Sequence, residues 1–137
     1  MPAVRAPERT LTQIDYVRLT RLLARETEVR DADSLDQLLA FSELVASPSV
    51  PRDVVTMYSQ ILVEDEASGA RMKMALCYPA DADPAMGRIS VLAPLGTALL
   101  GLRVGDVAQW TLPAGAPRRT RIVQVLFQPE AAGDYTT

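Results

Sequence analysis

Two segments near the start of the chain carry apolar residues at the helical period. The first runs from Thr12 to Arg25, where leucines recur at steps of three and four residues, the spacing of one helix face. Thr12 and Asp15 have the spacing of a capping box at its start. The second begins near Asp33 or Ser34 and runs to about Ala46. Joined by a short loop, the two helices are expected to pack as an antiparallel hairpin. The second helix is expected to present one face formed by Leu35, Leu38, Leu39, Phe41, Ser42 and Val45.

Beyond a proline-rich link at residues 47–51, the hydrophobic period changes from 3.6 to 2. Runs of alternating or continuous apolar residues, bounded by proline, glycine and polar turns, are typical of strands. One short helix is expected between Pro94 and Gly101, over residues 97–100. Consecutive strands joined by tight turns form a small antiparallel sheet that covers one face of a core. The expected strands are 59–64, 71–78, 89–92, 107–112 and 120–128, with a polar turn at 64–69.

The link at 47–51 predicts a division of the chain into two parts. Residues 1–47 would form the helical part, and residues 48–137 the sheet part, so the fold class is α+β. The aromatic residues Tyr78, Trp110 and Phe127 are expected to face the core of the sheet part.

Composition limits the class of protein. The 137 residues are 48% hydrophobic and 23% charged, which is ordinary for a globular domain. No apolar run is long enough for a membrane span, and no signal-peptide pattern opens the chain. The single cysteine, Cys77, predicts a reducing cytoplasm. A net charge of −3 argues against nucleic-acid binding and favours a protein partner.

The residue types also exclude several kinds of site. The chain has no histidine and one cysteine, which excludes Ser-His-Asp and Cys-His nucleophiles and the usual zinc sites. Gly96 and Gly101 have the glycine spacing of a phosphate loop, but Leu102 and Arg103 follow where lysine and serine or threonine are needed. These exclusions leave carboxylate–metal chemistry and binding. We expect no catalytic residue, no bound metal and no cofactor.

Three strings carry a family resemblance. They are Asp53-Val-Val-Thr-Met57, the run from Ala93-Pro-Leu-Gly96 through Ala98-Leu-Leu-Gly-Leu-Arg-Val-Gly-Asp106, and Gln128-Pro-Glu-Ala-Ala-Gly-Asp-Tyr135. Together with a helical hairpin followed by a sheet, they resemble the bacterial transcript-cleavage factors GreA and GreB over nearly the whole chain. Within that superfamily the resemblance is closer to the branch of nucleoside diphosphate kinase regulators.

The resemblance implies an FKBP-like fold for the sheet part. It also implies a monomer that binds the β′ subunit of RNA polymerase at the rim of the secondary channel and competes there with Gre factors. An indirect effect on nucleoside diphosphate kinase levels would follow. No membrane and no sequence-specific nucleic acid is expected as a partner.

Leu92, Ala93 and Pro94 fall on the turn by which Gre factors contact polymerase. Pro94 would make the turn rigid, Ala93 would permit close approach, and an exposed Leu92 would supply apolar area to the contact. The chain departs from the family pattern here, because Leu92 replaces an acidic residue of GreB and Ala93 replaces a serine.

Gre factors also insert a long helical arm whose acidic tip holds magnesium at the polymerase active site. The corresponding loop here carries Glu28, Asp31 and Asp33, which is compatible with a cleavage tip. Helices of about 13 residues reach only ~20 Å, about half the length of the Gre arm. The alternative is therefore a solvated loop whose charges complement the dipole of the next helix.

A basic stripe on the first helix, Arg18, Arg21 and Arg25, has two interpretations. It is either a solvated face, partly paired with acids of the neighbouring helix, or a surface for an acidic part of polymerase. Three functions thus remain open: a polymerase-binding regulator without cleavage activity, a cleavage factor, and an FKBP-like enzyme or interaction module unrelated to transcription.

Overall fold

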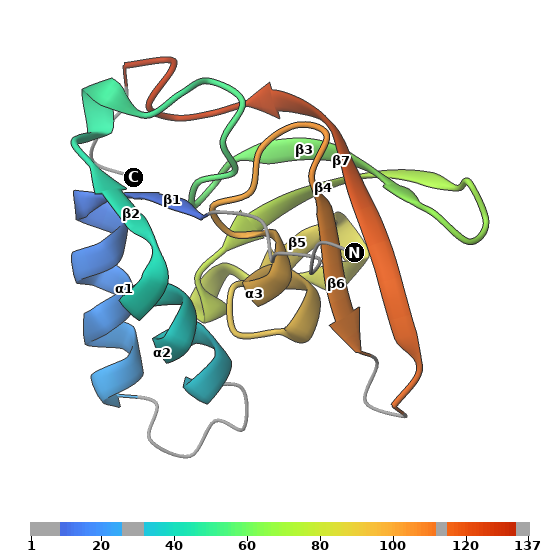
Figure 1. The fold of residues 1–137 in the computed structure, drawn as a ribbon, viewed down its shortest axis with the longest axis horizontal. Coiled ribbons are helices and arrows are strands. Elements are labelled where there is room, and N and C mark those ends of the chain that lie inside the picture. The colour runs from blue at the N-terminus through green and yellow to red at the C-terminus, as the bar shows by residue number, and fades with distance from the viewer. Residues whose placement is uncertain (1–8, 26–31, 112–114, 134–137) are drawn as a thin grey trace, which may run out of the picture.

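A five-stranded sheet with helices packed against it forms a mixed α+β fold (Figure 1). The computed structural model describes residues 9–25, 32–111 and 115–133. The elements in chain order are β1 (Thr10–Thr12), α1 (Gln13–Arg25), α2 (Ala32–Phe41), β2 (Glu43–Val45), the 3₁₀ turn η1 (Ser47–Ser49), β3 (Gln60–Asp65), β4 (Arg71–Cys77), the 3₁₀ turns η2 (Pro79–Asp81) and η3 (Pro84–Met86), β5 (Arg88–Ser90), α3 (Pro94–Leu99), β6 (Val107–Thr111) and β7 (Pro117–Phe127).

The sheet has the strand order β5-β4-β3-β7-β6, and three of its four pairings are antiparallel: β4–β3, β3–β7 and β7–β6. Burial alternates along β3, where Ile61 and Val63 are buried and Gln60 is exposed. This alternation suits a strand at the centre of a sheet that has one face against the core. Opposite Ile61 stand Met74 on one side and Val125 on the other. The strands predicted from the period-2 pattern, and the polar turn between the first two, are thus confirmed with small shifts of their ends.

One edge of the sheet differs from the expected antiparallel order. β5 pairs with β4 in parallel, with Leu76 opposite Ile89. The irregular stretch after Tyr78, which contains η2 and η3, carries the chain back so that both strands run the same way. β5 ends at Ser90 rather than at Leu92, because the chain turns there into α3.

The helix α1 confirms the first helical prediction almost residue for residue. Its start is capped by the hydroxyl of Thr12, which accepts a hydrogen bond from the backbone N–H of Asp15 at 3.0 Å. Within the ranges that the structure covers, no helix is both long and apolar enough to cross a membrane.

The second helical prediction is wrong at its C-terminal end. α2 stops at Phe41, and residues 43–45 form β2, which pairs in parallel with β1. The backbone N–H of Glu43 donates to the carbonyl of Arg9 at 2.9 Å. Pairing with a segment distant in sequence thus replaces the last helical turn, and it leaves Phe41 86% exposed instead of on the buried face.

α1 and α2 lie side by side and run in opposite directions at one end of the sheet (Figure 1). Their leucines join the same buried cluster as the inward residues of the sheet, for example Ile61 and Ile122. Tyr78 and Trp110 pack against this cluster as expected, but Phe127 is 41% exposed at the end of β7. The helical members of the cluster are Leu19, Leu22, Leu35 and Leu39.

Candidate functional site

The segment from Ser90 to Thr97, here called the α3 turn, contains the predicted contact residues. Its helix begins at Pro94 rather than at Thr97, with Ala93 as the N-cap. Proline suits the first helical position, since its missing N–H would have no partner there. The hydroxyl of Thr97 donates to the carbonyl of Val91 at 2.6 Å, and the N–H of Ala93 donates to the carbonyl of Ser90 at 3.0 Å. The turn is therefore closed by its own hydrogen bonds.

Gly96 allows the α3 turn to fold back on β5. A Cβ at this position would lie 2.0 Å from the carbonyl oxygen of Ser90 and 3.1 Å from the Cα of Val91. Neither atom belongs to a side chain that could move aside. Only glycine therefore fits where the first turn of α3 crosses the end of β5.

The other end of α3 is held by the N-terminal segment. One guanidinium nitrogen of Arg9 lies 2.8 Å from the carbonyl oxygens of Ala98 and Leu100 and 3.4 Å from that of Thr97. These are carbonyls that a helix end leaves without partners. Burial lowers the pKa of Arg9, and the charge of Asp106 opposes that effect. Gly101 then ends the helix at a positive φ of 80°, as the sequence predicted.

Leu92 does not lie as the sequence suggested. Its side chain is 8% exposed and belongs to the hydrophobic core cluster. The chain turns at this position to bring α3 onto the sheet, and the apolar side chain faces inward as a result. The expectation of an exposed Leu92 is wrong. Ala93 and Pro94 are half-buried, so these two keep accessible surface on the turn.

The predicted acidic loop is only partly covered by the structure. Glu28 and Asp31 lie outside the described residues, and Asp33 is described only as a backbone position within α2. Among the residues whose side chains are described, no group of three acidic or cysteine residues could hold a metal ion.

The first turn of α1 carries a buried carboxylate, that of Asp15. Asp15 is 2% exposed, and its side chain accepts a hydrogen bond from the backbone N–H of Met57. Burial raises the pKa of Asp15 to about 7; the hydrogen bond from Met57 opposes this shift, and the charge of Glu130 adds to it. Asp15 therefore links the start of α1 to the segment before β3 and is not simply a helix cap.

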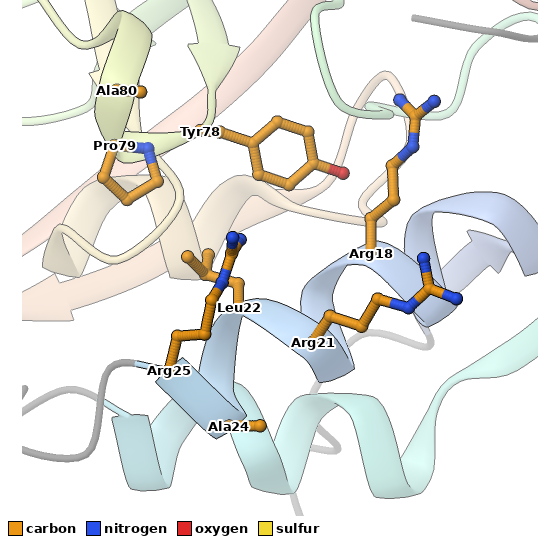
Figure 2. Close-up of a pocket in the computed structure, with 8 residues that line it drawn as sticks. All are labelled: Arg18, Arg21, Leu22, Ala24, Arg25, Tyr78, Pro79 and Ala80. Atoms are coloured by element: carbon orange, nitrogen blue, oxygen red, sulfur yellow. The ribbon is translucent and has the colours of Figure 1, made fainter.

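The arginine stripe lines a cleft of about 860 Å³ between α1 and the segment after β4 (Figure 2). Arg21 and Arg25 are exposed and form no ion pair with any carboxylate in the described part of the chain. Burial raises the pKa values of both Asp15 and Tyr78, and the charge of the half-buried Arg18 opposes this rise. Below, this surface is called the α1 cleft. The other residues that line it are Leu22, Ala24, Tyr78, Pro79 and Ala80.

Two residues that hold elements of the fold together, Arg9 and Asp15, are not marked as such by the sequence pattern. Arg9 precedes every periodic segment and carries no motif. Asp15 has the spacing of a capping-box residue, but an acid inside an apolar helical face also signals that its side chain has a partner elsewhere.

Comparison with known proteins finds similar proteins among transcription elongation factors and regulators of nucleoside diphosphate kinase. The model of the family described as "Transcription elongation factor, GreA/GreB, C-term" matches residues 50–127. The chain is 40% identical over 104 residues to the regulator of nucleoside diphosphate kinase of Escherichia coli strain K12, covering 76% of each protein. It is 32% identical over 81 residues to the transcription elongation factor GreA of Flavobacterium johnsoniae, covering 59% of this chain and 51% of that protein.

A solved structure has the same overall fold. The GreA/GreB transcription elongation factor of Nitrosomonas europaea superposes with a TM-score of 0.74 at 38% sequence identity. The superposition covers 88% of this chain and 99% of that one. The resemblance noted from the three sequence strings is thereby confirmed.

Proposed function

Because this chain belongs to the GreA/GreB family of transcription elongation factors, we propose that it is a regulator that binds RNA polymerase. Its site would be the rim of the secondary channel on the β′ subunit, where it would compete with Gre factors. It would not stimulate RNA cleavage and would have no catalytic residue of its own.

The observation that carries this proposal is the construction of the α3 turn. The turn lies inside the range that the family model matches. The turn is closed by the hydrogen bonds of Ala93 and Thr97, and the C-terminal end of α3 is held by Arg9. Ala93 and Pro94 remain accessible on this fixed backbone. A rigid accessible turn loses little conformational entropy on binding, which favours its use as a contact.

The lengths of the helices support a role without cleavage. α1 has 13 residues and α2 has 10, which correspond to about 20 Å and about 15 Å. An arm of this length would leave Glu28, Asp31 and Asp33 well short of the polymerase active site. These acids would then be solvated charges, and the protein would occupy the channel entrance without supplying magnesium ligands.

The finer parts of the proposal follow from the family. Residues 1–47 would act as a short helical hairpin, and residues 48–137 as an FKBP-like domain that carries the polymerase contact. The protein would act as a monomer in the cytoplasm, where polymerase works. One relative is named a regulator of nucleoside diphosphate kinase, so an indirect effect on the levels of that kinase is part of the proposal.

Competition for core RNA polymerase tests the site. A fluorescently labelled Gre factor bound to polymerase should be displaced by this protein as its concentration rises. Ala93→Arg places a long charged side chain on the accessible turn and should weaken displacement about tenfold, which corresponds to about 1.4 kcal/mol. Pro94→Ala should weaken it by a smaller factor.

Ala93→Ser is the matched control. It introduces an N-cap hydroxyl without bulk and should displace the Gre factor at least as well as the parent. Leu92 is unsuitable for this test, because its buried side chain would report on folding. If Ala93→Arg folds normally and competes as well as the parent, the contact lies elsewhere.

A cleavage assay on backtracked complexes tests the absence of activity. The protein alone should leave the rate of RNA cleavage unchanged, and it should slow Gre-stimulated cleavage as it is added. Charge reversal at Asp31 and Asp33 should change neither result. Acceleration of cleavage that depends on these two acids would instead identify a cleavage factor.

A further inference from the structure

The α1 cleft is a second accessible surface, separate from the α3 turn, and two of its arginines, Arg21 and Arg25, form no ion pair with the described residues. Five arginines elsewhere in the described chain pair with a carboxylate, whereas the exposed Arg52 and Arg88 form no ion pair with the described residues. Arg71 pairs with Glu64 at 3.1 Å, and Arg103 pairs with Asp53 at the same distance. The β7 arginines pair with acids of the β3–β4 turn, the distances being 3.7 Å for Arg118–Asp65, 2.7 Å for Arg119–Glu66 and 2.9 Å for Arg121–Glu66.

Arg21 and Arg25 contrast with these sheet arginines. They extend from one face of α1 at the rim of the cleft (Figure 2), and neither reaches a carboxylate among the described residues. Asp81, next to the cleft wall at Ala80, accepts a hydrogen bond from the hydroxyl of Tyr58. Guanidinium groups bind carboxylates and phosphates through paired hydrogen bonds, so an anionic ligand fits this rim.

The spacing of the arginines indicates the shape of that ligand. Arg18, Arg21 and Arg25 are separated by three and four residues, so their charges follow the helix axis at steps of about 5 Å. Acidic residues three or four apart on a partner helix have the same rise, and alternate residues of a partner strand lie about 7 Å apart. Two carboxylates one helical turn apart on one chain segment therefore match Arg21 and Arg25.

The rest of the lining decides between classes of macromolecule. Opposite the arginines, the cleft is walled by Pro79 and the ring of Tyr78 (Figure 2), which suit aliphatic side chains placed between carboxylates. Binding of a nucleic-acid backbone gains most from a broad positive field, whereas this chain has a net charge of −3. A protein segment with few carboxylates needs only the local positive charge of the arginines.

We propose that the α1 cleft docks an acidic segment of a partner protein, with carboxylates on Arg21 and Arg25 and apolar side chains against Pro79 and the ring of Tyr78. This inference rests on the proposed function, since RNA polymerase would supply the segment. The α3 turn and the α1 cleft would then form two separate contacts with the same partner. Contact at the cleft would be the salt-sensitive one, because its charges are exposed.

Binding of core RNA polymerase by paired variants tests this inference. The double variant Arg21→Gln/Arg25→Gln should raise the Kd about tenfold at low salt and should lose part of the salt dependence of binding. The matched control, Arg119→Gln/Arg121→Gln, removes the same charge from arginines whose side chains are 56% and 51% exposed. It should change the Kd less than about twofold. Equal effects of the two double variants, or no effect of the first, would overturn the inference while leaving the proposed polymerase binding in place.

A second measurement does not depend on polymerase. A labelled peptide with glutamate at every third or fourth position and leucine between them should shift the NMR signals of Arg21, Arg25 and Ala80. A single-stranded RNA of ten nucleotides should compete poorly with it. If the RNA binds the cleft more tightly than the peptide, or the peptide shifts none of these signals, the inference is wrong even if polymerase binding is confirmed.

Discussion

The side chain of Asp15 accepts a hydrogen bond from the backbone N–H of Met57, with 3.1 Å between nitrogen and oxygen. This bond joins the first turn of α1 to the segment that leads into β3. Both residues are at most 2% exposed. A buried carboxylate costs free energy when it is ionised, so the contact between the helices and the sheet depends on the protonation of Asp15.

We therefore predict that the free energy of unfolding falls as the pH rises from about 4 to about 7. Burial raises the pKa of Asp15 from 3.8 to about 7. Between these values the folded state holds a proton that the unfolded state has lost, so stability decreases with pH and levels off above about 7. The full effect is on the order of 4 kcal/mol. Urea denaturation at several pH values measures it.

Asp15→Asn should remove this dependence. The amide oxygen can still accept from Met57, but the side chain carries no charge at any pH, so the variant should be at least as stable as the parent at pH 8. Asp36→Asn removes a charge from an exposed position on α2 and should leave the pH profile of the parent unchanged. A profile that Asp15→Asn does not alter would show that another group causes the dependence.

The elements that the sequence predicted correctly are those whose signals are local. α1 follows from its leucine period and from the Thr12 cap. The β3–β4 turn follows from its polar residues between two alternating runs. In each case neighbouring residues carry both the pattern and the contacts that satisfy it.

The elements that the sequence missed depend on distant partners. Val45 continues the helical pattern of the second segment, yet it stands opposite Thr12 in a parallel pair of strands. Leu92 sits on a turn, yet the crossing of α3 over β5 buries it. Arg9 belongs to no periodic segment. Pairings between segments far apart in the sequence leave no local pattern, so only the folded arrangement reveals them.

Arg9 gives a second prediction, because its guanidinium holds the C-terminal carbonyls of α3. Arg9→Ala should lower the free energy of unfolding by about 2–3 kcal/mol, since charge-assisted hydrogen bonds are lost and carbonyls of buried residues are left without a partner. Hydrogen exchange of the α3 amides should accelerate more than that of the β3 amides. Arg71→Ala breaks a surface ion pair with a side chain that is 58% exposed, and it should cost less than about 1 kcal/mol.

If both arginine variants lose the same stability, the contact of Arg9 with α3 contributes no more than a surface pair. The α3 turn would then be held by its own hydrogen bonds alone. Any loss of polymerase competition in Arg9→Ala should, by contrast, follow the loosening of α3, because Arg9 itself lies at the opposite end of the helix from Ala93 and Pro94.

Gly96→Ala gives the sharpest test of how the α3 turn is built. The added methyl group would meet the carbonyl of Ser90 at 2.0 Å, so either α3 or β5 must shift. We expect a loss of about 3 kcal/mol in urea denaturation, at the upper end for overpacking in a core. Gly69→Ala is the control: its Cβ would meet nothing within 4 Å, but its φ is +73°, so only the backbone cost of about 1 kcal/mol applies. A loss for Gly96→Ala no larger than that of Gly69→Ala would mean that α3 does not cross β5 this closely, and the fixed position of Ala93 and Pro94 would lose its structural basis.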